Sequence, residues 1–122
     1  MANATQTYEA IAQQTANPRK VEASLLLKAA LRLQAVHDSW DNSRSELDEA
    51  LFFNRRLWAL LLAAVTNSGN PLPRNIRQNV ANLGIFVFKQ TITTMADPKP
   101  ESLGSLININ REVAAGLMGR AA

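Results

Sequence analysis

His37 is the only histidine of the 122-residue chain, and the chain contains no cysteine. Cysteine and histidine supply many of the nucleophiles, general bases and metal ligands of enzymes. Their scarcity excludes a cysteine nucleophile, a thiolate zinc site and a histidine pair. His37 shares a helical face with Leu26, Ala30 and Leu33, where a bundle-facing or edge histidine is the ordinary outcome. The sequence therefore predicts no enzyme activity, no metal site and no cofactor.

Glu46, Asp48 and Glu49 form the densest group of carboxylates. They lie near the start of a predicted helix, where the helix dipole favours negative charge. That role accounts for them without an acid pair or a metal site. No segment resembles a phosphate-binding loop.

An Asn-Arg pair follows an apolar run twice, as Asn54-Arg55 and as Asn110-Arg111. In each case the asparagine falls within the apolar stripe of a predicted helix, where a polar side chain needs a hydrogen-bond partner. Two interpretations remain open. The asparagine fixes helix register from inside the core, as in coiled coils, or it bonds the backbone of a partner.

Breaking and capping residues divide the chain into helices. Asn17-Pro18 is typical of a helix start, and so is the capping-box spacing of Ser43 and Glu46. Gly119 is a plausible C-cap of the last helix. Helices are predicted over residues 18–40, 43–67, 73–95 and 101–118, and a shorter Gln/Ala-rich helix over residues 5–15.

These elements predict an all-α fold, a small single-domain antiparallel bundle of four main helices plus the short N-terminal helix. Residues 1–122 form one domain, with a bundle over 17–119 and residues 1–16 as a helix expected to be mobile when unbound. Residues 1–16 lack the pattern of a secretory signal. The longest apolar stretch, residues 57–65, falls short of the roughly 20 residues of a spanning helix, so no membrane insertion is expected.

Two predicted helices carry more apolar surface than one core face needs. In the helix from residue 73, one stripe (Ile76, Val80, Leu83, Val87) supplies a core face, and Trp58 is expected in the core from the preceding helix. A second stripe contains Ala81, Ile85, Phe88, Ile92 and Met95. Either this helix is central in the bundle, or the second stripe is an exposed patch beside Lys89 that binds a partner.

The charges are distributed unevenly. Residues 68–96 hold Arg74, Arg77 and Lys89 with no acid, which accounts for the whole net charge of +3. Three cations are too sparse for a nucleic-acid interface, so direct nucleic-acid binding is not expected. The candidate partner-binding residues are Ile85, Phe88, Lys89, Ile92, Tyr8, Ile11, Asn54, Arg55, Asn110 and Arg111.

Several stretches together resemble the bacterial flagellar family FlaF, whose members regulate flagellin synthesis and secretion. The most specific is Ala50-Leu51-Phe52-Phe53-Asn54-Arg55-Arg56-Leu57-Trp58. The others are Tyr8, Asn17-Pro18-Arg19, Glu22, Leu25-Leu26, Lys28-Ala29-Ala30, Leu33, Leu72-Pro73, Arg77, Asn82-Leu83-Gly84-Ile85, Ile107-Asn108-Ile109-Asn110-Arg111 and Ala115-Gly116-Leu117.

The resemblance implies a cytoplasmic, non-enzymatic protein that binds flagellin before export and promotes its synthesis or secretion. It also implies opposition to a second regulator, FlbT, which restrains flagellin expression through the flagellin mRNA. The alternative is a post-transcriptional regulator of that mRNA, acting through RNA or an RNA-binding partner. An apolar groove and a phosphate-binding surface would differ in salt dependence.

Overall fold

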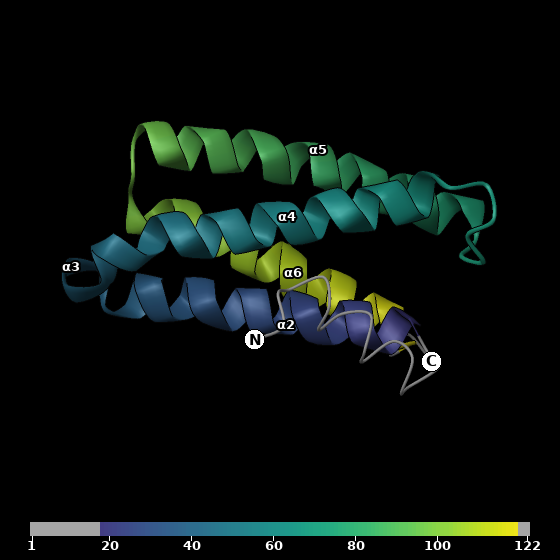
Figure 1. Ribbon diagram of the computed structural model, residues 1–122, viewed down its shortest axis with the longest axis horizontal. Coiled ribbons are helices and arrows are strands. Elements are labelled where there is room, and N and C mark those ends of the chain that lie inside the picture. Colours follow the sequence, from purple (N-terminus) through teal and green to yellow (C-terminus); the bar gives the residue numbers. More distant parts are fainter. Residues whose placement is uncertain (1–17, 120–122) are drawn as a thin grey trace, which may run out of the picture.

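The computed structural model describes residues 18–119, and all regular structure in that range is helical (Figure 1). The main helices are α2 (Pro18–Asp38), α4 (Leu47–Thr66), α5 (Arg74–Ala96) and α6 (Leu103–Leu117). A short α3 (Trp40–Ser43) and 3-10 turns at Arg44–Glu46 and Pro100–Ser102 are the remaining helical elements of the described chain. The prediction of an all-α fold with four main helices is confirmed. The helix predicted over residues 5–15 lies outside the described range.

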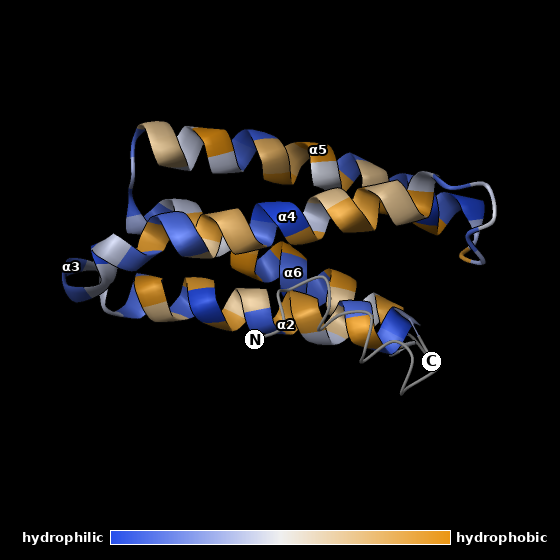
Figure 2. Ribbon diagram, viewed as in Figure 1, coloured by the Kyte–Doolittle hydropathy of each residue, from blue (hydrophilic) through white to orange (hydrophobic). Residues whose placement is uncertain are grey.

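The four main helices run along the long axis of the molecule with reversals between them (Figure 1). α2 packs against both α6 and α4, and α4 packs on its other side against α5. α5 makes much less contact with α6 than with α4, so it lies at the edge of the bundle. Hydrophobic residues nevertheless recur along α5 as they do along the inner helices (Figure 2).

Two helix ends follow the sequence signals. α2 begins at Pro18, whose missing N–H and fixed φ suit the first helical position. After α6, Gly119 has a φ of 74°, the left-handed conformation that glycine adopts most readily at a helix end.

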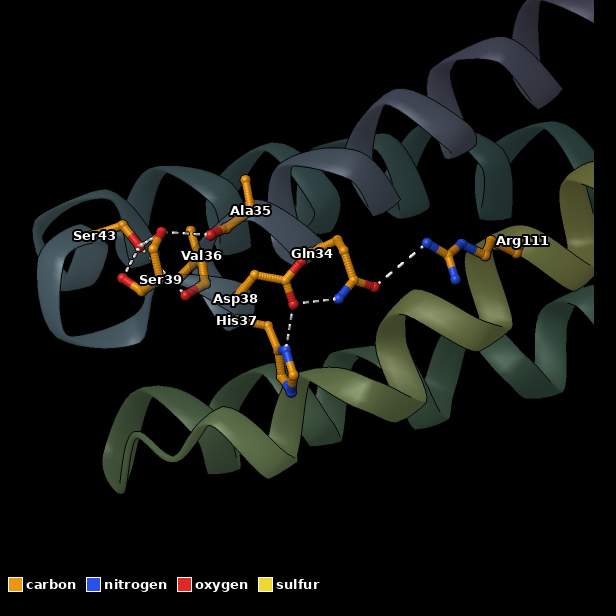
Figure 3. Close-up of polar contacts among 8 residues, drawn as sticks. All are labelled: Gln34, Ala35, Val36, His37, Asp38, Ser39, Ser43 and Arg111. Atoms are coloured by element: carbon orange, nitrogen blue, oxygen red, sulfur yellow. Dashed lines mark hydrogen bonds and ion pairs between the residues drawn. The ribbon is translucent and has the colours of Figure 1, made fainter.

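The capping box predicted at Ser43 and Glu46 is wrong. α4 begins at Leu47, because the connection from α2 is itself wound into α3 and a 3-10 turn. The Ser43 hydroxyl points back to the preceding helix, with its Oγ 2.7 Å from the Ser39 carbonyl oxygen and 3.3 Å from that of Val36 (Figure 3). Ser43 therefore satisfies carbonyl groups at the end of α2 instead of amides at the start of α4.

A hydrogen-bond chain around Trp58 joins three helices. Trp58 is 0% exposed, which confirms its predicted place in the core. Its Nε1 donates to Asn110 Oδ1 of α6 at 2.9 Å, and Asn110 Nδ2 donates to Asn54 Oδ1 of α4 at 2.7 Å. Asn110 Nδ2 also lies 3.2 Å from the carbonyl oxygen of Leu26 in α2. Both asparagines are fully buried, so they join helices within the core.

The face that α5 turns toward the bundle consists of small and hydroxyl-bearing side chains. Its buried residues are Val80, Gly84, Val87, Thr91 and Thr94. A Cβ built on Gly84 would lie 3.5 Å from Trp58 Cε3, so the indole occupies the space opposite this glycine. Each threonine hydroxyl donates to a carbonyl four residues earlier in α5, at 2.7 Å, which allows its burial.

The predicted core stripe of α5 is therefore only partly right. Val80 and Val87 are buried, whereas Ile76 is exposed and Leu83 half-buried. The helix is rotated from the orientation that hydrophobicity alone favours. The physical reason is the bulk of the Trp58 ring, which packs opposite Gly84, where α5 carries no side chain.

We predict that Trp58→Ala lowers the free energy of unfolding by about 3–5 kcal/mol, because it removes a fully buried aromatic ring and leaves a cavity. Urea unfolding followed by circular dichroism measures the change. Phe52→Ala is the matched control on the same helix, because Phe52 is 52% exposed, and it should cost about 1 kcal/mol or less. Equal losses in the two variants would contradict the central role of the indole.

A second prediction separates the two asparagines, whose truncation to alanine removes the same volume. Asn110→Ala leaves Trp58 Nε1 without its acceptor, whereas in Asn54→Ala the Asn110 amide keeps the Leu26 carbonyl. We expect Asn110→Ala to cost about 1–3 kcal/mol more than Asn54→Ala, the range for an orphaned buried polar group. Urea unfolding of both variants tests this, and the reverse ranking would contradict the assigned hydrogen bonds.

Candidate functional site

A row of apolar side chains runs along the outer flank of α5. Its spacing of four, three, four and three residues is that of a coiled-coil seam. We call this set the α5 row; it consists of Ala81, Ile85, Phe88, Ile92 and Met95.

Most of the α5 row is open to solvent. Ile92 is 65% exposed, and Ile85 and Met95 are each 52% exposed. Ala81 and Phe88 are half-buried and pack against the core. Of the two alternatives for this helix, the exposed patch is what the structure shows at the two isoleucines, and only in part at Phe88. The phenylalanine anchors the row to the bundle, and the isoleucines are available to a partner.

The α5 row borders α4. At the N-terminal end of α5, a shallow hollow of about 230 Å³ lies between the two helices. It is lined by Val65 and Thr66 of α4 and by Arg74, Arg77, Gln78 and Ala81 of α5. The first residue of the row therefore lies at the α4–α5 boundary, and a ligand on the row would lie beside α4.

α4 contributes an exposed aromatic residue that the sequence analysis missed. Phe52 is exposed, and the guanidinium groups of Arg55 and Arg56 lie 5.7 Å and 5.8 Å from its ring centroid. Phe52 lies off the buried face of α4, whose buried residues do not include it. An aromatic residue off the core stripes, with arginines three and four positions later, is a signal that could have identified it.

The two helices that carry these residues are purely cationic over a long stretch. Residues 50–96 contain no Asp or Glu, and their charged residues are Arg55, Arg56, Arg74, Arg77 and Lys89. Among residues 18–119, ion pairs join His37 to Asp38 and Lys99 to Asp97, so these five cations have no carboxylate partner within the described range. The α4–α5 side of the molecule is thus both apolar and positively charged.

The asparagines proposed as partner-binding residues do not fit that role. Asn54 and Asn110 are 0% exposed and bond each other in the core, so a partner could reach them only after the helices separated. Their neighbours Arg55 and Arg111 are exposed, and Arg111 Nη2 donates to Gln34 Oε1 of α2 at 3.3 Å (Figure 3). The candidates Tyr8 and Ile11 lie outside the described residues.

His37 belongs to an exposed polar cluster at the end of α2 (Figure 3). Its Nδ1 lies 3.0 Å from Asp38 Oδ1, and Gln34 Nε2 donates to the same oxygen at 2.8 Å. The hydrogen bond from His37, followed by that from Gln34, holds the pKa of the Asp38 carboxyl below its usual value. Among residues 18–119 no hydroxyl is bonded to the His37 ring, so the cluster provides no nucleophile–base pair of the kind used in acyl transfer.

The carboxylates near the start of α4 remain at the surface. Asp48 and Glu49 lie in its first turn, and Glu46 is the residue before the helix. Glu46 and Glu49 line a shallow hollow of about 210 Å³ together with Arg32, Ala35, Val36 and Ala50. In the described part of the chain, no three potential metal-ligating side chains come together. None of its helices combines the length and apolar character needed to cross a bilayer.

Comparison with known proteins identifies the family. No curated protein and no solved structure matches the chain. Residues 4–117 match the family described as flagellar protein FlaF. The match spans the α4 and α5 surface as well as the buried Trp58–Asn110 pair, and this chain belongs to the FlaF family of flagellar proteins.

Proposed function

We propose that this flagellar protein binds flagellin in the cytoplasm before export and promotes its synthesis or secretion, as a chaperone or export adaptor. In this role it opposes FlbT. The observation that carries the proposal is the exposed α5 row, an apolar seam at helical spacing on an edge helix. Membership of a flagellar family supplies the context.

The shape of the α5 row suits a helical ligand. From Ala81 to Met95 the row extends about 21 Å along the helix axis, at roughly 1.5 Å per residue. A partner helix of about four turns could lay its apolar stripe on this seam, which is the helix-in-groove mode of recognition. The family's role implies that the ends of flagellin form helices that must not polymerise in the cytoplasm. Covering such a helix would hold flagellin unassembled until export.

The proposed role is non-catalytic. His37 is held by Asp38 at the end of α2, away from the α5 row on the opposite side of α4. Binding of a helix by apolar contact requires no reactive group, so the α5 row and its surroundings are sufficient for the function.

The alternative function is regulation of flagellin mRNA, through RNA or an RNA-binding partner. The unpaired cations of residues 50–96 and the arginine-flanked Phe52 ring favour it, because bases stack on such platforms. The exposed part of the α5 row is aliphatic, however, which favours a protein helix. A pull-down with the purified protein, testing flagellin and the flagellin leader RNA side by side at low and high salt, distinguishes the two. RNA capture that falls steeply with salt, without flagellin capture, would contradict the chaperone proposal.

We predict that Ile92→Ala weakens flagellin binding by at least about 1 kcal/mol, the usual threshold for a contributing interface residue. Titration calorimetry measures the affinity, and the melting temperature should stay nearly unchanged because the side chain is mostly exposed. Leu31→Ala on α2 is the matched control, because Leu31 and Ile92 are both 65% exposed. An equal effect of the two variants would mean that flagellin does not select the α5 row.

A further inference from the structure

We propose that the α4–α5 face selects a partner helix that carries carboxylates beside its apolar stripe. This inference rests on the proposed function in taking the α5 row as the docking surface, and it adds the charge that the occupant must have. The relevant features are the α5 row, the exposed Phe52 of α4 and the unpaired cations around them.

The register of α5 places charge next to the seam. In a heptad with Ile85 and Ile92 at position a, Phe88 falls at position d. Lys89 then occupies position e, which flanks the row on its open side. The equivalent flanking positions on the inner side are occupied by Gly84 and Thr91, which are buried against the bundle. A docked helix would therefore meet Lys89 on the solvent side of the row, where interhelical ion pairs form in coiled coils.

The N-terminal end of the row is cationic as well. Arg74 and Arg77 line the hollow next to Ala81. The Nε of Arg77 is buried and has no hydrogen-bond partner among residues 18–119, although its Nη1 lies 3.3 Å from the Asn67 carbonyl oxygen. A carboxylate in this hollow would form charge-assisted hydrogen bonds with guanidinium groups that have no acid partner among residues 18–119.

α4 adds cations on the same hairpin. Arg55 and Arg56 flank the exposed Phe52 ring and lie on the helix that borders α5. No Asp or Glu of residues 50–96 offsets them. A partner with acidic flanks thus gains attraction from both helices, whereas a basic partner is repelled by both.

The same charges argue against a second copy of this chain as the occupant. If two α5 rows packed together, Lys89, Arg74 and Arg77 of one copy would face a helix with no acid of its own. Like charges across a helix interface oppose association. The apolar seam is therefore suited to a different helix, one with acidic residues.

Two synthetic amphipathic peptides of about 20 residues test the inference. They share one apolar stripe, and the flanking positions are all Glu in one peptide and all Lys in the other. Fluorescence anisotropy with the full-length protein should show at least about tenfold tighter binding of the Glu peptide in about 50 mM salt, and a smaller preference in about 500 mM salt, where exposed charges are screened. Lys89→Glu should lower the affinity for the Glu peptide by about threefold or more. Arg19→Glu, an exposed charge reversal on α2, controls for net charge and should have a smaller effect.

Three results would overturn the inference. The first is equal affinity for the two peptides, or an equal response to Lys89→Glu and Arg19→Glu. The second is displacement of the bound Glu peptide by a single-stranded RNA, which would show that the cations bind phosphate groups. The third is a dimer in sedimentation that Ile92→Asp abolishes, which would make a second copy the occupant.

Flagellin measured with the same variants separates this inference from the proposed function. Flagellin binding that responds to neither Ile92→Ala nor Lys89→Glu overturns the inference and leaves the chaperone proposal standing. Charge-selective binding of the Glu peptide without any flagellin binding supports the inference and contradicts the chaperone proposal. The expected result is that flagellin and the Glu peptide respond alike to both variants.

Discussion

Trp58 brings an N–H donor into the centre of the bundle, and a buried donor requires an acceptor. Asn110 of α6 supplies it, and the amide of Asn110 in turn binds Asn54 of α4 and a backbone carbonyl of α2. Apolar side chains can slide past one another at little cost, but these hydrogen bonds have fixed distances and directions. The chain of polar groups therefore sets the register of α2, α4 and α6 against one another.

The size of the same indole determines how α5 can approach. A residue larger than glycine or alanine at position 84 would meet the Trp58 ring, whose nearest atom is 3.5 Å from a Cβ built there. α5 consequently packs through Gly84 and its small neighbours, and Ile85 and Ile92 point outward. The exposed α5 row is in this sense a consequence of how the core is filled. A helix with large apolar residues on its free side is stable here because its other face, which includes Val80, Gly84 and Val87, is buried in the bundle.

The charge distribution gives this apolar surface a preference. An apolar seam alone would accept many amphipathic helices, including a second copy of α5. The acid-free stretch over residues 50–96 places Lys89 beside the seam and Arg74 and Arg77 at its N-terminal end, which disfavours basic partners and self-association. In the proposed binding mode, apolar contact supplies the affinity and charge supplies the selectivity, through different residues of the same two helices.

The all-α class, the positions of four main helices and the burial of Trp58 could be predicted from the sequence, because helix periodicity and caps act locally along the chain. The sequence also indicated that Asn54 and Asn110 lie within apolar stripes, and that Ala81 to Met95 carries a second stripe. The sequence could not show that the two asparagines bond each other, that the Ser43 hydroxyl bonds a carbonyl group of α2, or which stripe of α5 faces inward. Those outcomes depend on groups far apart in the chain, such as Trp58 opposite Gly84 and Asn110 beside Leu26. Such groups come within contact distance only when the helices pack, so the exposure of Ile85 and Ile92 follows from the folded structure and could not be read from the sequence.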